Sequence, residues 1–272
     1  MPDALYVAAR RVLLDALAAL EPHLEGVVLV GAQAIYVHAG EGDLAVAPYT
    51  TDGDLALNPG YLAAHPTLEE ALRGVGFVAG DQPGRWIGSE SIVIDLMVPD
   101  ALGGPGRRGA RLGPHGERSA RKARGLGATL VDRSRVRLEA LDATDRRSVV
   151  AWVAGPAALL VAKLHKIAER IGTPGRRDDK DALDVLRLLR HVPTDELASN
   201  LRVLLRHPSS AGETREALLH LERLFGLPSA EGSRMAVRAT ELLEDPDTIA
   251  ASCAILAGDL LAAVGRASTP EE

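Results

Sequence analysis

The sequence predicts an α/β fold of the α+β type, with a mixed sheet and flanking helices first and an all-helical carboxyl-terminal bundle after it. Apolar runs of strand length recur in the first half, at residues 27–30, 50–57 and 91–98, as expected of buried strands. From Pro156 onward the apolar residues instead recur every three or four positions, which is typical of amphipathic helices. We therefore expect a sheet-bearing unit over residues 1–154 and a helical unit over residues 155–272.

The elements of the first unit follow from its local patterns. Residues 4–21 form an amphipathic pattern and are expected to cover the sheet as a helix. The buried strand at 27–30 is ended by Gly31; a short helix, a polar loop and the strand at 50–57 follow. Thr67 and Glu70 have capping-box spacing and start a helix through Arg73. Strand-like segments at 76–78 and 85–87 precede the strand at 91–98, and segments at 129–141 and 148–153 are expected to extend the sheet's edge.

Composition excludes several classes of protein. The 272 residues suffice for one large domain or two smaller ones, and the net charge of −6 argues against a broadly basic nucleic-acid coat but allows a local basic patch. The single cysteine, Cys253, excludes an intrachain disulfide framework and zinc sites built from cysteines. The amino terminus carries charges within its apolar pattern, unlike a signal peptide. The longest uncharged runs fall short of a spanning helix. We expect a cytoplasmic protein with no membrane partner.

Asp52 and Asp54 are the first candidates for chemistry. Residues two apart in a strand point the same way, so two carboxylates share one face, with Gly53 between them. Two like charges this close repel each other, and one would ordinarily hold a proton. A divalent cation removes that repulsion, and carboxylate sites suit Mg²⁺ with substrate phosphates completing its shell. The alternative is a solvated turn, because Asp-Gly is a common hairpin signal.

Asp95 lies inside the apolar strand at 91–98, flanked by Ile94 and Leu96. An unpaired carboxylate would be costly to bury there. One interpretation is a strand-end carboxylate that accepts hydrogen bonds from the backbone. The sharper interpretation is a third carboxylate of the metal site, on a strand adjacent to the Asp pair.

Residues 103–127 are rich in glycine and strongly basic, and they predict a loop or mobile insertion. The segment has no aromatic residue for base stacking and no phosphate-binding P-loop pattern. Its basic side chains are either simply solvated or an electrostatic handle for RNA phosphates. They are Arg107, Arg108, Arg111, Arg118, Arg121, Lys122 and Arg124.

Two helices of the second unit carry further candidates. The helix at 157–171 places Lys163, Lys166 and Arg170 three and four residues apart, on one face next to its apolar stripe. The next helix begins near residue 179 and carries Asp181 and Asp184 on one face. Those acids could simply favour the helix dipole. The remaining helices, expected at 195–205, 213–225, 233–243 and 247–264, show no catalytic cluster and are expected to pack as a bundle.

In this order, the elements resemble the nucleotidyltransferases of the DNA polymerase β superfamily, and most of all the AbiEii-type and MenT toxins. Members of that family have Gly-Gly or Gly-Ser at a helix start, then Asp-x-Asp on the next strand; Gly31 keeps the glycine, but Ala32 stands where many members have serine. The family's third motif, E/A-K-L before an arginine, is matched by AKLHKIAER at 162–170, and its R/K-D-x-x-D element by residues 180–184. The resemblance covers residues 25–190 or so and implies a nucleotidyltransferase sheet.

The resemblance implies a Mg²⁺-dependent enzyme that transfers NMP from an NTP substrate. Asp52 and Asp54, with Asp95 assisting, would bind Mg²⁺, and the helix start at Gly31 and Ala32 would hold phosphate through its free N–H groups. The acceptor implied is the 3′ end of tRNA or another RNA, the role is that of a toxin that blocks translation, and the implied partner is a cognate antitoxin.

The resemblance also gives roles to the two helices of the second unit. Lys163 would approach the nucleotide phosphates, and Lys166 is close enough in phase to compete for that role. Asp181 would orient the lysine or act as a base near the acceptor hydroxyl, and Asp184 is grouped with the nucleotide-binding residues.

Two other hypotheses remain at this point. An enzyme that nucleotidylates or phosphorylates a protein hydroxyl would keep the acids and lysines but would not need the basic segment. A non-catalytic binding module would keep the acidic cluster for structure alone and would show no Mg²⁺-dependent nucleotide binding.

Overall fold

The computed structural model describes residues 3–40, 49–173, 179–240 and 243–266; the polar loop expected at 41–48 lies outside them. Within this part of the chain, eight strands form one mixed sheet, so the α+β class expected from the sequence is confirmed. The strands are β1 (Val27–Val30), β2 (Asp52–Leu57), β3 (Val78–Ala79), β4 (Arg85–Ile87), β5 (Val93–Pro99), β6 (Arg121–Ala123), β7 (Arg133–Glu139) and β8 (Ser148–Ala154).

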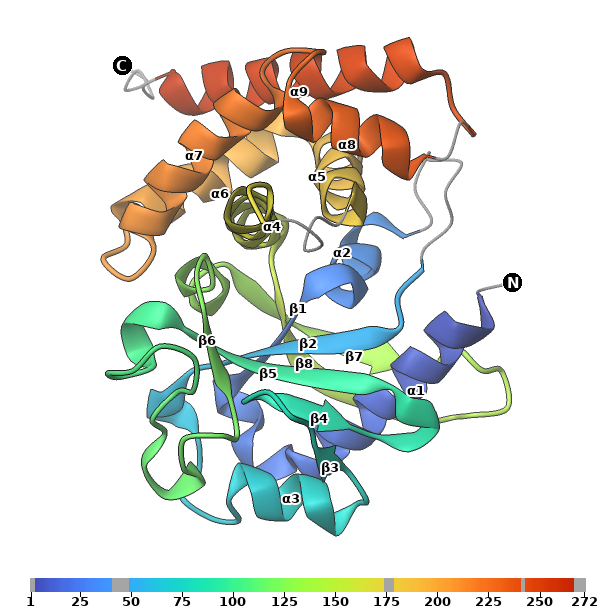
Figure 1. Ribbon diagram of the computed structural model, residues 1–272, viewed down its shortest axis with the longest axis vertical. Helices are drawn as coiled ribbons and strands as arrows, with labels where there is room; N and C mark the ends of the chain where they lie inside the picture. The colour runs from blue at the N-terminus through green and yellow to red at the C-terminus, as the bar shows by residue number, and fades with distance from the viewer. Residues whose placement is uncertain (1–2, 41–48, 174–178, 241–242, 267–272) are drawn as a thin grey trace, which may run out of the picture.

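The first helices flank the sheet, and the later ones form the helical second half of the chain. They are α1 (Ala4–Ala19), α2 (Gly31–Ala39), α3 (Leu68–Gly74), α4 (Pro156–Arg170), α5 (Asp179–His191), α6 (Thr194–Arg206), α7 (Ala211–Phe225), α8 (Glu231–Ala239) and α9 (Pro246–Gly265). Helices α1 and α3 lie on one side of the sheet, while α2 and the helices from α4 onward lie on the other (Figure 1). The expected capping box at the start of α3 is present, with reciprocal bonds between Thr67 and Glu70.

The strand order is β3-β4-β5-β2-β1-β8-β7, and β6 pairs with β5 off this path. β1 runs antiparallel to β2 and parallel to β8, and β2 runs parallel to β5. The central strand β1 is buried at every residue, which explains its uninterrupted apolar run. This order places β2 and β5, the two strands with candidate carboxylates, side by side in the middle of the sheet (Figure 1).

Three expectations about the strands differ from the structure. The region 127–130 is a short 3₁₀ turn because it packs mainly against α4 and α7, with fewer contacts to β1, so β7 begins only at Arg133. β8 lies inside the sheet, paired on both sides, while β7 forms the edge. The basic segment contains β6, which pairs with Met97–Pro99 of β5 beyond the short β4. β4 leaves that half of β5 without a partner, and β6 supplies one.

A half-buried carboxylate, that of Asp132, fixes the start of α4. Asp132 accepts a hydrogen bond from the backbone N–H of Ala158 at 3.0 Å, in the manner of an N-cap. Its backbone oxygen accepts a second one from Gly155. A Cβ at Gly155 would lie 2.0 Å from the Asp132 carboxylate, so only glycine fits there. The helix that carries both candidate lysines is therefore anchored at its first turn to Asp132, the residue directly before β7.

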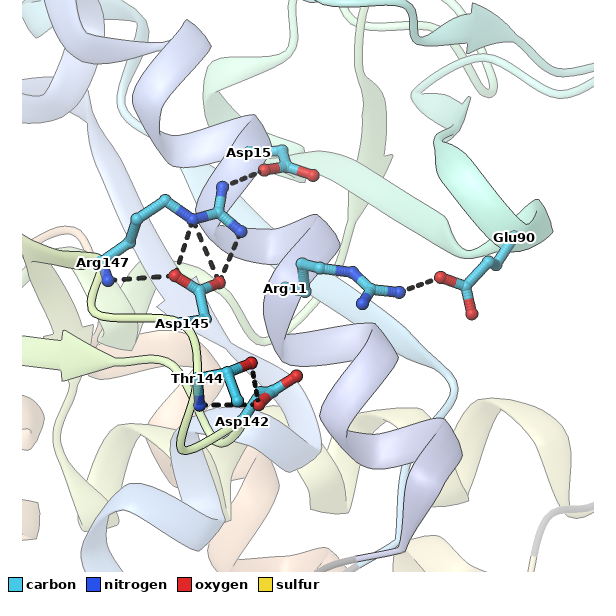
Figure 2. A network of polar contacts seen from close by, with 7 residues as sticks. All are labelled: Arg11, Asp15, Glu90, Asp142, Thr144, Asp145 and Arg147. Atoms are coloured by element: carbon cyan, nitrogen blue, oxygen red, sulfur yellow. Dashed lines mark hydrogen bonds and ion pairs between the residues drawn. The ribbon is translucent and has the colours of Figure 1, made fainter.

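Charged side chains tie the outer face of α1 to two loops (Figure 2). Arg11 pairs with Glu90, in the connection between β4 and β5. Arg147, directly before β8, contacts both Asp15 of α1 and Asp145. Its hydrogen bonds lower the pKa of Asp145 to about 2. Surface ion pairs of this kind contribute little stability individually.

Helix α9 is, within the described part of the chain, the one helix long and apolar enough to cross a membrane by length and composition. One of its faces is buried against the helical bundle through Ile249, Cys253, Ala257, Leu260 and Ala263. These residues make up the buried share of its apolar window, which is 28%.

Candidate functional site

The three candidate carboxylates share one face of the sheet. Asp54 of β2 lies opposite Asp95 of β5 in the parallel pairing, and Asp52 is two residues before Asp54 on the same face. Gly53 points the other way, where a Cβ would touch Leu13 of α1. The acids therefore face α2 and α4, on the side of the sheet away from α1.

The acidic pair is held in place by the strand and helix beside it. Asp52 accepts a hydrogen bond from Thr50 Oγ1 at 2.7 Å. Its backbone oxygen accepts another from Gln33 Nε2 of α2 at 2.9 Å, and the buried Arg10 donates in turn to Gln33 Oε1. Gly31 has φ +69°, and a Cβ there would lie 2.1 Å from Asp54 Oδ2. Glycine is thus required at the helix start to leave room for the Asp54 carboxylate.

The electrostatics of the acids favour a cation between them. Burial raises the pKa of Asp54 to about 6, and the negative charges of Asp52 and Asp95 add to that shift against the opposing effect of Lys166 and Arg121. Arg121 of β6 donates to Asp95 Oδ2 at 3.2 Å. Three carboxylates on adjacent strands form a set of oxygen donors that fits a hard divalent cation such as Mg²⁺. Gly31 keeps this side of Asp54 clear.

The acids open into a cavity of about 500 Å³ between the sheet, the basic segment and α4. This volume falls within the range of about 300–1,000 Å³ typical of small-molecule sites. Its lining combines the three carboxylates with basic side chains from both walls. The charged lining residues are Asp52, Asp54, Arg85, Asp95, Asp100, Arg107, Arg121, Lys122, Arg124, Lys163, Lys166, Glu169 and Arg170.

Lys163 reaches the cavity wall but is held from behind by two carboxylates. Its Nζ donates to Asp181 Oδ1 at 2.7 Å and to Asp184 Oδ2 at 2.6 Å, and its side chain is only 7% exposed. Burial alone would lower the pKa of Lys163, but the two negative charges outweigh it and raise this pKa well above the ordinary value. Burial opposes ionisation of Asp181 as well, yet the charges of Lys163 and Lys166 lower its pKa to about 2.

Lys166 and Arg170 stand on the same face of α4, nearer to solvent. The Lys166 side chain is 35% exposed and donates to Asp181 Oδ1 at 2.8 Å. Arg170 lies 3.6 Å from the other oxygen of Asp181. One carboxylate thus faces three cations, so two of them can meet a negatively charged ligand in the cavity without leaving Asp181 unpaired.

The basic segment is divided between the cavity and the outer surface. Arg107, Arg121, Lys122 and Arg124 line the cavity. Lys122 also contacts the backbone oxygens of Gly104 and Gly106, which folds the loop back on itself. The other members point elsewhere: Arg108 donates to Gln82, Arg111 pairs with Glu117, and Arg118 donates to the backbone of Asp81.

The structure gathers most of the sequence-predicted site residues around one cavity. Asp52, Asp54, Asp95, Gly31, Lys163 and Lys166 all line it. Ala32, Asp181 and Asp184 are not among its lining residues. The helical spacing already placed Arg170 on the same face as the two lysines, although no role in the site was assigned to it from the sequence. No local pattern points to Arg85, which also lines the cavity.

Comparisons with known proteins add only a distant fold likeness. No family model matches the chain, and no curated protein matches it. A solved structure described as the crystal structure of JHP933 from Helicobacter pylori is similar with a TM-score of 0.46 and 12% sequence identity. The match covers 97% of this chain and 95% of that one.

Proposed function

We propose that this protein is a Mg²⁺-dependent nucleotidyltransferase that transfers NMP from an NTP to an RNA acceptor. The single observation that carries the proposal is the cavity itself. Three carboxylates from paired strands lie on its floor, and Lys166, Arg170 and the basic segment form its walls. Phosphoryl-group chemistry on a triphosphate requires a carboxylate-bound metal on one side of the phosphates and cationic groups on the other.

The acids would hold the metal. Asp52 and Asp54, with Asp95, would bind Mg²⁺, which when bound supplies charge neutralisation at the phosphates and activation of the acceptor hydroxyl. Arg121 donates a hydrogen bond to Asp95, next to Asp54. Gly31 leaves the space that the Asp54 carboxylate occupies, and the free N–H groups at the start of α2 favour phosphate there.

We assign different roles to Lys163 and Lys166. Lys166 is the more exposed, so we assign it the contact with the nucleotide phosphates, with Arg170 beside it. Lys163 is buried between Asp181 and Asp184 and orients α4 against α5. Because Asp181 is 3% exposed and does not line the cavity, we assign it the role of positioning the cations, not that of a base at the acceptor.

RNA is the acceptor class that the cavity wall favours. Four cations of the basic segment line the cavity, and each contact with a phosphate adds to affinity in a salt-dependent way. The sequence resemblance narrows the acceptor to the 3′ end of tRNA and the biological role to that of a toxin with a cognate antitoxin.

Nucleotide binding tests the site without knowledge of the acceptor. Each NTP is titrated into the wild-type protein and into Asp54→Asn, with and without Mg²⁺. We expect at least one NTP to bind the wild type more tightly with Mg²⁺ and Asp54→Asn to lose that difference. Failure of Mg²⁺ to strengthen binding of any NTP would contradict the proposal and favour a binding module.

Paired arginine variants test the acceptor. Replacing Arg107 and Arg124 with glutamine removes two cavity cations, and we expect RNA affinity to fall and the slope of log affinity against log salt to decrease by about 1–2. The control replaces Arg108 and Arg118, which have the same charge but point away from the cavity. Equal effects of both pairs, or transfer to a protein that neither pair affects, would contradict the RNA acceptor.

A further inference from the structure

A second group of metal-ligating side chains lies outside the cavity, where α4 contacts α7. It consists of His165 on α4 and of Glu216 and His220 on α7, and one ligand atom from each lies within 4.8 Å of the others. The two imidazole rings are 5.4 Å apart and nearly perpendicular, and His220 Nε2 lies 3.7 Å from Glu216 Oε1. Glu216 and His220 are four residues apart, which places them on one face of α7.

We propose that this group, the His165 cluster, binds a divalent transition-metal ion, with Zn²⁺ as the best match. Two imidazole nitrogens and one carboxylate oxygen form a common zinc ligand set, with water in the fourth position. Mg²⁺ prefers oxygen ligands alone, so it belongs with the aspartates of the cavity and not here. Ligand atoms around tetrahedral zinc lie roughly 3.4 Å apart, given metal–ligand distances of about 2.0–2.1 Å. The half-exposed Glu216 side chain can rotate to close the remaining gap.

The hydrogen bonding of His165 prepares it to act as a ligand. Its Nε2 lies 2.8 Å from the backbone oxygen of Glu213, so the Nε2–H group donates there and Nδ1 is the ring nitrogen left for a metal. Metal-binding histidines usually donate their other ring N–H to a backbone carbonyl or a carboxylate in this way. The ring also packs directly on Gly125, where a Cβ would lie 2.8 Å from His165 Cδ2, which fixes its orientation.

His220 faces both other members of the His165 cluster. Its ring meets the His165 ring edge to face, and its Nε2 approaches the Glu216 carboxylate. The side chain is 17% exposed, so the fourth position of the metal is open to water.

A metal ion here would join three parts of the molecule. It would link α4 to α7, and α7 already holds the end of the basic segment: Glu213 accepts hydrogen bonds from the backbone of Gly125 at 3.0 Å and of Gly127 at 2.9 Å. The cluster uses none of the cavity's carboxylates, so this inference does not depend on the proposed function. Its expected effect is on stability, because a metal that binds only the folded chain stabilises it by mass action.

The test uses the full-length chain with Asp52 and Asp54 changed to asparagine, which removes the other candidate metal site. After chelation, ZnCl₂ is titrated by calorimetry and thermal unfolding is recorded. We expect one equivalent to bind and Tm to rise by roughly 5 °C when free Zn²⁺ is about 100-fold above Kd. Adding His220→Gln should abolish the bound equivalent and the rise in Tm, whereas His191→Gln, at the exposed end of α5, should preserve both.

One further variant and a folding control complete the test. Glu216→Gln removes a carboxylate that faces solvent, so it should fold normally and bind Zn²⁺ at least tenfold more weakly. Circular dichroism of each metal-free variant separates loss of the ligand from loss of the fold. Failure of Zn²⁺ to raise the Tm of the parent, or undiminished binding in correctly folded His220→Gln and Glu216→Gln chains, would overturn the assignment.

Discussion

The two lysines of α4 should respond very differently to the same substitution. Lys163→Met removes the ammonium group that lies between Asp181 and Asp184, whose side chains are 3% and 7% exposed. Asp184 then loses a partner at 2.6 Å within a buried site. Breaking a buried ion pair by removing one member costs about 3–5 kcal/mol, because the charge that remains has neither water nor a partner. We expect Lys163→Met to lower the free energy of unfolding by that amount.

Lys166→Met should behave in the opposite way. Its side chain is 35% exposed, and Asp181 keeps its contact with Lys163, so the loss of stability should be about 1 kcal/mol or less. A hydrogen bond to a charged group contributes about 1.5–3 kcal/mol, so losing a phosphate contact should slow transfer by roughly 10- to 100-fold. Urea unfolding gives the free energies, and initial rates of nucleotide transfer give the effect on turnover.

A compensated variant separates charge burial from packing. Combining Lys163→Met with Asp181→Asn and Asp184→Asn removes all three charges, and this triple variant should be more stable than Lys163→Met alone. A Lys163→Met protein within 1 kcal/mol of the wild type would refute the buried ion pair. Full turnover in Lys166→Met would refute its assignment to the phosphates.

Three further predictions follow from single contacts. Gly31→Ala should abolish Mg²⁺ binding because its Cβ meets the Asp54 carboxylate, whereas Gly40→Ala, also at positive φ but with open space around it, should keep Mg²⁺ binding. Calorimetry with Mg²⁺ would decide, and equal binding by both variants would contradict the close approach of Gly31 to Asp54. The folded-state pKa of Asp181 is about 2, below the ordinary value of 3.8, so its stabilisation is complete above pH 4 and lost as pH falls toward 2; this amounts to about 2 kcal/mol of pH-dependent stability that Asp181→Asn should lack in urea titrations, and identical pH slopes would argue against it. Asp132→Ala should destabilise the protein by about 1–2 kcal/mol through the lost cap of α4, and an unchanged urea midpoint would show that the cap contributes nothing.

Local patterns predicted the secondary structure well because the periodicities are strong. The apolar run of β1, the period of two around Asp52 and Asp54, and the stripes of α4 and α5 are each confined to one element. β6 could not be predicted, because three residues in a glycine- and arginine-rich segment have no strand pattern of their own. That strand exists because β5 extends beyond β4 and has an edge to fill.

The site was predictable in part for the same reason. The alternation of a strand places Asp52 and Asp54 on one face, but the register that sets Asp54 opposite Asp95 depends on how two distant strands pair. Helical spacing placed Lys163 and Lys166 on neighbouring positions without showing which is buried. Only the packing of α5 against α4, which brings Asp181 and Asp184 to Lys163, distinguishes them.

One measurement tests the acid cluster and the basic walls of the cavity together. Each NTP, radiolabelled at its α-phosphate, is incubated with Mg²⁺ and total tRNA, using the wild-type protein and Asp54→Asn. We predict that the wild type transfers label from at least one NTP to tRNA and that Asp54→Asn transfers none. Label on protein instead of tRNA would contradict the RNA acceptor, and no label on any acceptor, together with no Mg²⁺-dependent NTP binding, would contradict the enzyme itself.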